Sequence, residues 1–327
     1  MGGAAKSGQA GRPLKVGVWL PTIERTMAGE TPRWTDIQTL ARVAEDVGFD
    51  SLWMSDHLIY RLPGREDQPV GIWECWSLLA ALAATTQRVQ LGPFVSCIPF
   101  RNPALLAKMA ETVDEISGGR LILGLGAGWH EPEFRNFGYP FDHRAARFQE
   151  AFTIIHGLLT TGKVDYEGRY YQVRECELRP RGPRPNGVPI MIGSNGPRVL
   201  RMTVPYVAAW NSDWTTHPSE IPPLMERVDA ACRDVGRDPA EIERTAAVQI
   251  DLPIRDPARS GRAVMSGATA PGVNPVQPAT GDADELAELL RGYAAVGISH
   301  VQLWLEPATT AGFEWFASVL ERLDRSG

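Results

Sequence analysis

Cysteine is scarce in this chain of 327 residues, and the four that occur stand far apart, at Cys75, Cys97, Cys176 and Cys232. None of them forms a C-x-x-C pair, which argues against a structural zinc site and against a disulfide framework. Reduced thiols are typical of cytoplasmic proteins, so we expect the protein in the cytoplasm.

Other features that the sequence lacks narrow the class further. No apolar run has the length needed to cross a membrane, and no secretory signal precedes the first expected strand. The net charge is −6, which argues against a surface made for nucleic acid. The six histidines show no metal-ligand spacing, so we expect no metal. These absences favour a soluble protein whose partners are small molecules rather than nucleic acid or membrane.

Strands and helices alternate along almost the whole sequence. Residues 14–20 form an apolar strand pattern that ends at Pro21, and residues 34–47 carry apolar side chains at helical spacing before Gly48. The same alternation continues to residue 323 and gives about eight strand–helix units. That number and length predict an α/β protein with a single (β/α)8 TIM barrel, with an open doubly wound sheet as the alternative.

The domain prediction is a disordered leader over residues 1–13, which are small, polar and Gly-rich, followed by the barrel over residues 14–327. Two stretches exceed a minimal barrel. Residues 163–186 include a predicted hairpin at 166–176. Residues 255–281, rich in Gly, Pro, Ala and Ser, predict an insertion loop before the seventh helix. Insertions that follow barrel strands often act as lids, and the sequence leaves open whether this one closes.

Ionisable side chains follow the second predicted strand, where Ser55 leads into Asp56 and His57. Barrels place their functional groups at the carboxyl ends of strands. His57 is therefore a candidate for proton transfer near neutral pH, and Asp56 for holding a ligand in register. The alternative is that Asp56 caps the next turn and His57 is an ordinary loop residue.

Two glycine-containing loops follow other predicted strands. Residues 118–130 form a strand that breaks up at Gly124, Gly126 and Gly128, where small residues leave backbone N–H groups open to a phosphate or a ring edge. The spacing differs from the dinucleotide-binding fingerprint, and a plain turn is the alternative. Residues 193–196 form the second such loop.

A cysteine and several tryptophans also lie at strand ends. Cys97 lacks an assigned base, so a small buried wall residue is favoured over a nucleophile. The tryptophans would suit a flat apolar ring or would simply fill the barrel; they are Trp19, Trp53, Trp129, Trp210 and Trp304.

Together these strand ends resemble the luciferase-like flavin oxidoreductase superfamily, especially its branch that uses the deazaflavin coenzyme F420. The likeness covers nearly the whole chain after residue 13. It is carried by Trp53-Met-Ser-Asp-His57 and by the stretch from Ser117 to Trp129, with further matches at residues 18–21, 101–108, 147–150 and 189–196.

The resemblance implies roles for individual residues. Asp56 would contact the deazaflavin ring, and His57 would give or take a proton beside it. The Cys97–Ile98 bond falls where relatives have a non-prolyl cis peptide behind the ring. The resemblance also implies cofactor contacts on two sides: Ala127, Gly128 and Trp129 on one side, and Ser194, Asn195 and Gly196 on the phosphate side. Trp129 takes the place of a residue that is acidic in a sugar-phosphate-oxidising relative.

The resemblance also implies an activity, namely hydride transfer between coenzyme F420 and a small organic substrate, and a homodimer. A sugar phosphate is not expected, because the lysines that would bind it have no counterpart. Arginines at 179, 181, 184, 255, 259 and 262 are candidates for the coenzyme's acidic tail, with a solvated charged loop as the alternative. Two other functions remain open: an FMN-dependent monooxygenase that uses oxygen, and a non-catalytic flavin-binding barrel.

Overall fold

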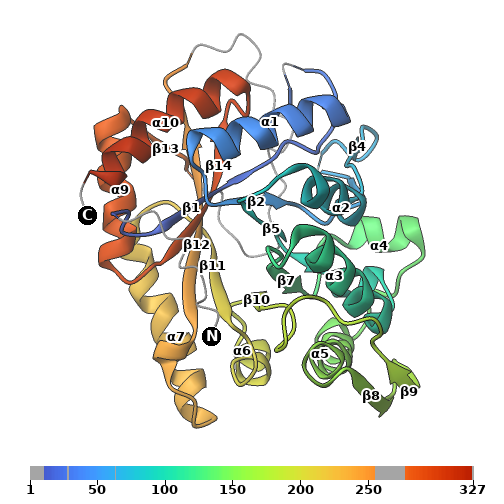
Figure 1. Cartoon of the computed structure of the whole chain (residues 1–327). Coiled ribbons are helices and arrows are strands. Elements are labelled where there is room, and N and C mark those ends of the chain that lie inside the picture. The colour runs from blue at the N-terminus through green and yellow to red at the C-terminus, as the bar shows by residue number, and fades with distance from the viewer. Residues whose placement is uncertain (1–10, 28, 63, 255–276, 326–327) are drawn as a thin grey trace.

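The central feature of the structure, a computed structural model that describes residues 11–27, 29–62, 64–254 and 277–325, is a barrel of parallel strands (Figure 1). Its strands are β1 (Lys15–Trp19), β2 (Ser51–Met54), β5 (Gln90–Pro93), β7 (Leu123–Gly126), β10 (Ile190–Gly193), β11 (Ala209–Thr215), β12 (Glu243–Asp251) and β14 (His300–Glu306).

The hydrogen-bonded order of these strands is β5-β2-β1-β14-β12-β11-β10-β7, and every pair in it is parallel. The ring closes between β5 and the residues that precede β7. There the Leu91 N–H donates to the Arg120 carbonyl over 3.0 Å, and the Ile122 N–H donates to the Leu91 carbonyl over 2.8 Å. The predicted TIM barrel is confirmed, and the open sheet is excluded.

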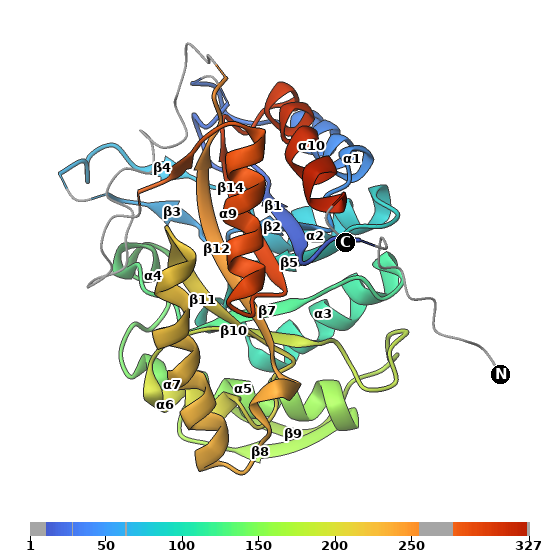
Figure 2. The ribbon, with the colours of Figure 1, turned by 90° about the vertical axis from the view of Figure 1, so that its left-hand side faces the viewer.

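Helices cover the outside of the strands, as Figure 2 shows for α9, α10 and α1. The surrounding helices are α1 (Trp34–Val47), α2 (Cys75–Thr85), α3 (Pro103–Ser117), α5 (Arg144–Thr161), α6 (Pro197–Thr203), α7 (Ile221–Asp234), α9 (Ala283–Ala295) and α10 (Thr310–Asp324). α3 shows why the sequence marks such bounds. The Asn102 side chain accepts from the first free N–H groups, and Gly118 ends the helix in the left-handed conformation at φ 66°.

Smaller elements decorate the barrel. The predicted hairpin is present as β8 (Lys163–Glu167) and β9 (Gln172–Glu177), which lies beside α5 in Figure 1. The sequence did not predict the rest: β3 (Ile59–Tyr60) with β4 (Val70–Gly71), β6 (Ser96–Cys97), β13 (Ala279–Thr280), α4 (Glu131–Phe137), and the short 3-10 helices Ile98–Phe100, Pro218–Glu220 and Pro239–Glu241.

The first predicted domain boundary, at residue 13, differs from the structure. Arg12, assigned to a disordered leader, donates to Asp50 and Asp324, and its side chain is only 5% exposed. The predicted leader is therefore too long, while residues 1–10 lie outside the described part. Most of the predicted insertion, residues 255–276, also lies outside it. Residues 279–280 form β13, which pairs with β12.

The inside of the barrel is filled by aromatic and apolar side chains. Trp53 is fully buried there, together with Met191 and the nearly buried Ile122. A Cβ atom added at Gly17 would lie 2.5 Å from the Trp53 indole nitrogen, and one at Gly92 would lie 2.4 Å from its ring. These two glycines therefore leave the volume that Trp53 occupies, in keeping with layered packing inside such barrels.

A buried histidine lies beside Trp53. The Trp53 indole N–H donates to the Ser51 hydroxyl over 2.7 Å, and that hydroxyl lies 2.7 Å from the Nε2 atom of His300. His300 is 1% exposed, and burial lowers its pKa from 6.5 to about 4. The neutral imidazole is therefore the form that the fold stabilises.

This burial predicts a pH dependence of stability. Between about pH 6.5 and pH 4 the unfolded chain binds a proton at His300 that the folded chain does not, so the free energy of unfolding falls as the pH falls. The contribution is on the order of 3 kcal/mol over this window. Urea unfolding of His300→Gln at several pH values should show a shallower loss than the parent chain. Parallel curves would contradict the assignment.

Candidate active site

Asp56 lies at the carboxyl end of β2 and is 2% exposed. Its Oδ2 atom accepts from the Ser96 hydroxyl and the Cys97 N–H, each over 2.9 Å. The Arg101 guanidinium donates to both carboxylate oxygens over 2.6 and 2.9 Å. The same guanidinium also donates to Glu74 over 2.6 Å. A carboxylate that is this deeply buried is stabilised only with such a complete set of partners.

These contacts give Asp56 a structural task that the sequence analysis did not foresee. The carboxylate ties the end of β2 to β6 and to the residue before the cap of α3. Its contact with a coenzyme ring stays a prediction, because both oxygens already accept hydrogen bonds from the protein. The alternative considered for Asp56 was a cap on the following turn. The hydrogen bonds of Asp56 go instead to Ser96, Cys97 and Arg101.

His57 is held by a carboxylate that sequence analysis missed. Its Nδ1 atom lies 2.8 Å from Oε1 of Glu133, and Oε2 of Glu133 accepts from the Leu58 N–H over 2.9 Å. The Glu133 side chain is 1% exposed and that of His57 is 16% exposed. The carboxylate fixes the ring and favours the proton on Nδ1, so Nε2 is the nitrogen left for proton exchange.

The helix that carries Glu133, α4, has local signals in the sequence. Pro132 lies in its first turn, Glu131 and Glu133 complement the positive end of the helix, and Gly138 ends it with φ 77°. These signals could have identified the helix. They could not have shown that its carboxylate reaches His57.

Aromatic rings surround the imidazole. Tyr60 lies 4.6 Å from the His57 ring and Trp129 lies 5.6 Å from it, between ring centroids. Tyr60 is buried, and this burial, together with the charge of Glu133, raises its pKa well above the usual value. Trp129, predicted beside the coenzyme, thus lies next to His57, and its contact with the coenzyme stays a prediction.

The non-prolyl cis peptide lies elsewhere than predicted. It joins Phe94 to Val95, whereas Cys97–Ile98 is not among the cis bonds. The Val95 side chain packs against the glycines that end two strands, Gly126 of β7 and Gly193 of β10. Added Cβ atoms would lie 2.5 Å from it at Gly126 and 3.1 Å from it at Gly193. The packing of this wall residue explains these glycines, so they do not by themselves indicate a ligand.

The loop after β7 brings its predicted residues to the barrel mouth. Ala127, Gly128 and Trp129 are partly exposed, whereas β7 itself is buried. Gly128 adopts φ 74°, and a Cβ there would lie 2.6 Å from both Cys97 and Phe134. Its left-handed backbone therefore favours glycine. The backbone contacts predicted for Ala127 and Gly128 stay predictions.

The loop after β10 contains a buried polar atom that lacks a partner. Asn195 donates from its amide nitrogen to the Ser212 carbonyl over 3.0 Å, and Trp210 donates to the Ser194 carbonyl over 3.0 Å. The Asn195 Oδ1 atom is buried and has no hydrogen-bond partner among the described residues. Such an atom is expected to accept from a bound molecule or a water. Gly196 is exposed and caps α6.

Several other candidates are also placed. Cys97 is 4% exposed, and burial raises the pKa of its thiol well above the usual value, which supports a wall residue rather than a nucleophile. Arg181 and Arg184 pair with Glu111 and Asp114 of α3, away from the strand ends. They are thus committed to the fold, and the arginines at 255, 259 and 262 lie outside the described residues.

Comparison with known proteins places the chain in a family. Residues 14–253 match the model of the luciferase-like monooxygenase family. The chain belongs to that family, and the resemblance described from its sequence is confirmed.

Two named relatives illustrate the match. The chain is 30% identical to 5,10-methylenetetrahydromethanopterin reductase of Archaeoglobus fulgidus over 71% of its length and 65% of the reductase. It is 37% identical to F420-dependent glucose-6-phosphate dehydrogenase of Amycolatopsis mediterranei over 51% of its length and 49% of the dehydrogenase. The matches thus span less than two thirds of the length of these relatives.

Solved structures share the fold. An F420-dependent secondary alcohol dehydrogenase in complex with an F420-acetone adduct superposes with a TM-score of 0.77 at 20% identity, over 95% of this chain and 99% of the other. Riboflavin lyase with modified FMN superposes with a TM-score of 0.77 at 15% identity, over 95% and 91%.

Two kinds of feature are absent from the described residues. No helix in that part of the chain combines the length and apolar character needed to cross a membrane. No group of three or more His, Cys, Asp or Glu residues among them could hold a metal ion.

The ion pair of Asp56 yields a stability prediction. Arg101→Met leaves a buried carboxylate without its cation, which should lower the free energy of unfolding by about 3–5 kcal/mol. Glu74→Gln removes the other carboxylate that Arg101 contacts, but Glu74 is 42% exposed, so this control should cost less than about 1 kcal/mol. Chemical denaturation measures both, and equal losses would contradict the central role of the Asp56 pair.

Proposed function

We propose that the chain is a coenzyme F420-dependent oxidoreductase that transfers a hydride between the deazaflavin and a small organic substrate at the barrel mouth. The observation that carries the proposal is the His57–Glu133 pair at the carboxyl end of β2, in a chain of the luciferase-like family. Two relatives that bear the words F420-dependent in their names support the choice of coenzyme.

The described residues fit such a coenzyme. The unpartnered Oδ1 atom of Asn195 offers an acceptor to a donor of the bound molecule. Ala127, Gly128 and Trp129 are partly exposed residues at the same end of the barrel. Ser194 and Gly196 adjoin Asn195 and would line the phosphate side. Cys97 and Ile98 are both buried, and Cys97 would support the site through the hydrogen bond of its N–H to Asp56.

When bound, the deazaflavin supplies a carbon that accepts or donates a hydride, and the protein supplies binding, orientation and proton transfer. The balancing proton is assigned to Nε2 of His57, because Nδ1 is engaged by Glu133. Tyr60 and Trp129 keep the imidazole in a mostly apolar surrounding that limits access of water. Glu133 acts as a positioning residue through the imidazole.

Coenzyme binding is the first test of the proposal. Fluorescence titration of the purified chain should show saturable binding of F420 at lower concentration than of FMN. Tighter binding of FMN, with oxygen consumption, would favour the monooxygenase. Binding of F420 without absorbance change in the presence of alcohols or enones would favour a non-catalytic barrel.

The His57–Glu133 pair gives the second test. His57→Ala should reduce kcat by about 10²–10⁴-fold, the range for general acid–base groups, while the Kd for F420 changes little. Glu133→Gln should reduce kcat by at least about tenfold and alter the pH profile, because the imidazole loses its orienting carboxylate.

The matched control is Glu131→Gln, an exposed carboxylate in the same helix turn as Glu133. It should leave kcat and the pH profile unchanged. If His57→Ala turns over at the parent rate, the assignment of the proton to His57 is wrong.

A further inference from the structure

A second buried histidine, His130, lies immediately before α4 and is 6% exposed. Its Nε2 atom lies 3.0 Å from the backbone nitrogen of Arg61, whose N–H donates to it. A backbone N–H can only donate, so Nε2 must be the acceptor and carry no proton. The contact therefore identifies the ring as a neutral imidazole with its proton on Nδ1.

This hydrogen bond joins two segments that carry the candidate active site. Arg61 follows Tyr60 of β3, which lies beside α4 (Figure 2). The backbone of His130 belongs to the first turn of that helix, where its carbonyl accepts the Glu133 N–H over 3.2 Å. One imidazole thus ties the short β3–β4 hairpin to the turn that presents Glu133 to His57.

Tyr60 is the group whose position depends on this bond. Its ring centroid lies 4.6 Å from that of His57 and 5.4 Å from that of His130. β3 has two residues and pairs with β4, which also has two. A ladder of this length is not stable by itself and is held by contacts outside the pair. The bond from Arg61 to His130, one residue from Tyr60, is such a contact.

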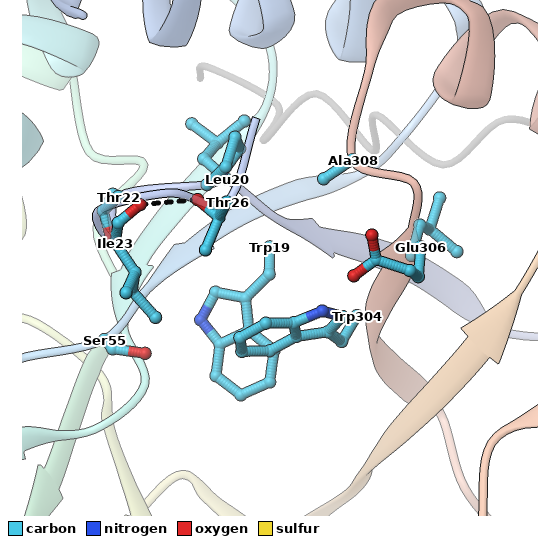
Figure 3. A pocket seen from close by; sticks show the side chains of 11 residues that line it. Trp19, Leu20, Thr22, Ile23, Thr26, Ser55, Trp304, Glu306 and Ala308 are labelled. Carbon is cyan, nitrogen blue, oxygen red and sulfur yellow. Dashed lines mark hydrogen bonds between the residues drawn. The ribbon is translucent and has the colours of Figure 1, made fainter. Parts of the chain in front are cut away.

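The same hairpin contributes to the barrel mouth. Tyr60 shares a small apolar cluster with Ile23. Ile23 in turn lines a small pocket whose walls include Trp19 and Trp304 (Figure 3). A displacement of Tyr60 would therefore change the surroundings of His57 and the wall of this pocket together.

The surroundings of His130 favour its neutral form. Burial lowers the pKa of His130 from its usual value of 6.5, the Glu133 carboxylate acts in the opposite direction, and a charged His57 adds to the lowering. Tyr60 is neutral, because its own pKa is raised well above the usual value. The acceptor for Arg61 is therefore present at neutral pH and is lost as the pH falls through the lowered pKa.

Two guanidinium groups of adjoining segments have partners of their own. Arg61 donates from its side chain to the Glu66 carbonyl, and Arg144 of α5 donates to the Gly128 carbonyl, each over 2.6 Å. Both hydrogen bonds end on backbone oxygens, which do not titrate, so a fall in pH leaves them in place.

We propose that His130 is a pH-sensitive positioning residue for His57. The neutral ring accepts the Arg61 N–H and keeps Tyr60 packed on the His57 imidazole, whereas the protonated ring has no acceptor and releases it. The inference rests on the proposed function where it concerns turnover. The hydrogen bond and its loss in acid require no coenzyme.

The first test follows hydrogen exchange of the Arg61 amide by NMR in the ¹⁵N-labelled, coenzyme-free chain, from about pH 8 to about pH 4.5. In His130→Gln the side-chain carbonyl takes the place of Nε2 and accepts at every pH, and in His130→Phe nothing accepts. The parent should exchange like His130→Gln at the upper end and about threefold to tenfold faster at the lower end, as expected for loss of one hydrogen bond. His130→Phe should show the faster exchange throughout.

The comparison isolates His130, because His300 titrates in the parent and in both variants alike. As a control, His143→Asn removes an exposed imidazole from a left-handed position, φ 51°, that Asn also tolerates, and it should behave as the parent does. Equal exchange of the parent and His130→Gln at the acid end would overturn the proposal. A protected Arg61 amide in His130→Phe would do the same.

The second test uses the coenzyme-loaded chain with an alcohol or enone that it turns over. His130→Phe should lower kcat by at least about tenfold, because Tyr60 no longer holds the His57 ring in place, and His130→Gln should recover most of this loss. The acid limb of the kcat profile should involve one titrating group fewer in His130→Gln than in the parent. Identical profiles would refute the link to His57. If F420 does not bind while the Arg61 exchange follows the expected pattern, the proposed function fails and the positioning of Tyr60 by His130 stands.

Discussion

The buried carboxylate of Asp56 is the constraint on which the barrel mouth depends. A charge in this position must be matched on all sides, and its partners come from β6 and from Arg101, which precedes α3. β6 in turn pairs with β7, with Ser96 opposite Leu125 and Cys97 opposite Gly126. The Asp56 carboxylate therefore helps to position the glycine loop after β7. It also positions the backbone of His57, which is the next residue in the chain.

Differences in side-chain size shape the interior in a similar way. Large residues occupy volume that glycines on neighbouring strands leave free, as Trp53 of β2 does beside Gly17 of β1 and Gly92 of β5. Val95 does the same against Gly126 and Gly193 nearer to the mouth. A glycine in these strands thus reflects a bulky neighbouring side chain inside the barrel more than a ligand.

Most of the fold could be predicted from the sequence, because its signals are local. Helix α1 has the predicted bounds, residues 34–47, since Gly48 ends a clear apolar periodicity. The strands at residues 59–60 and 70–71 were not predicted, because a strand of two residues is too short to show an alternation of apolar and polar side chains.

The candidate site was only partly predictable, because its decisive contacts join residues far apart in the chain. His57 and Glu133 are 76 positions apart, and Asp56 and Arg101 are 45 apart. Sequence pattern identified Asp56 and His57 as a strand-end pair, but not their separate partners. The cis peptide was placed three residues too far along, at Cys97–Ile98 instead of Phe94–Val95, because the resemblance locates a segment and not a single bond.

The contacts of Arg12 have a consequence for engineering the chain. Arg12 bridges Asp50 and Asp324, and an added Cβ at Gly11 would lie 2.8 Å from the Asp324 carbonyl oxygen. The two ends of the described barrel are thus adjacent in space. A circular permutant that joins them with a short linker and opens at the β8–β9 turn would retain every barrel strand pairing. The new termini would then lie in the β8–β9 hairpin, far in sequence from His57 and Trp19.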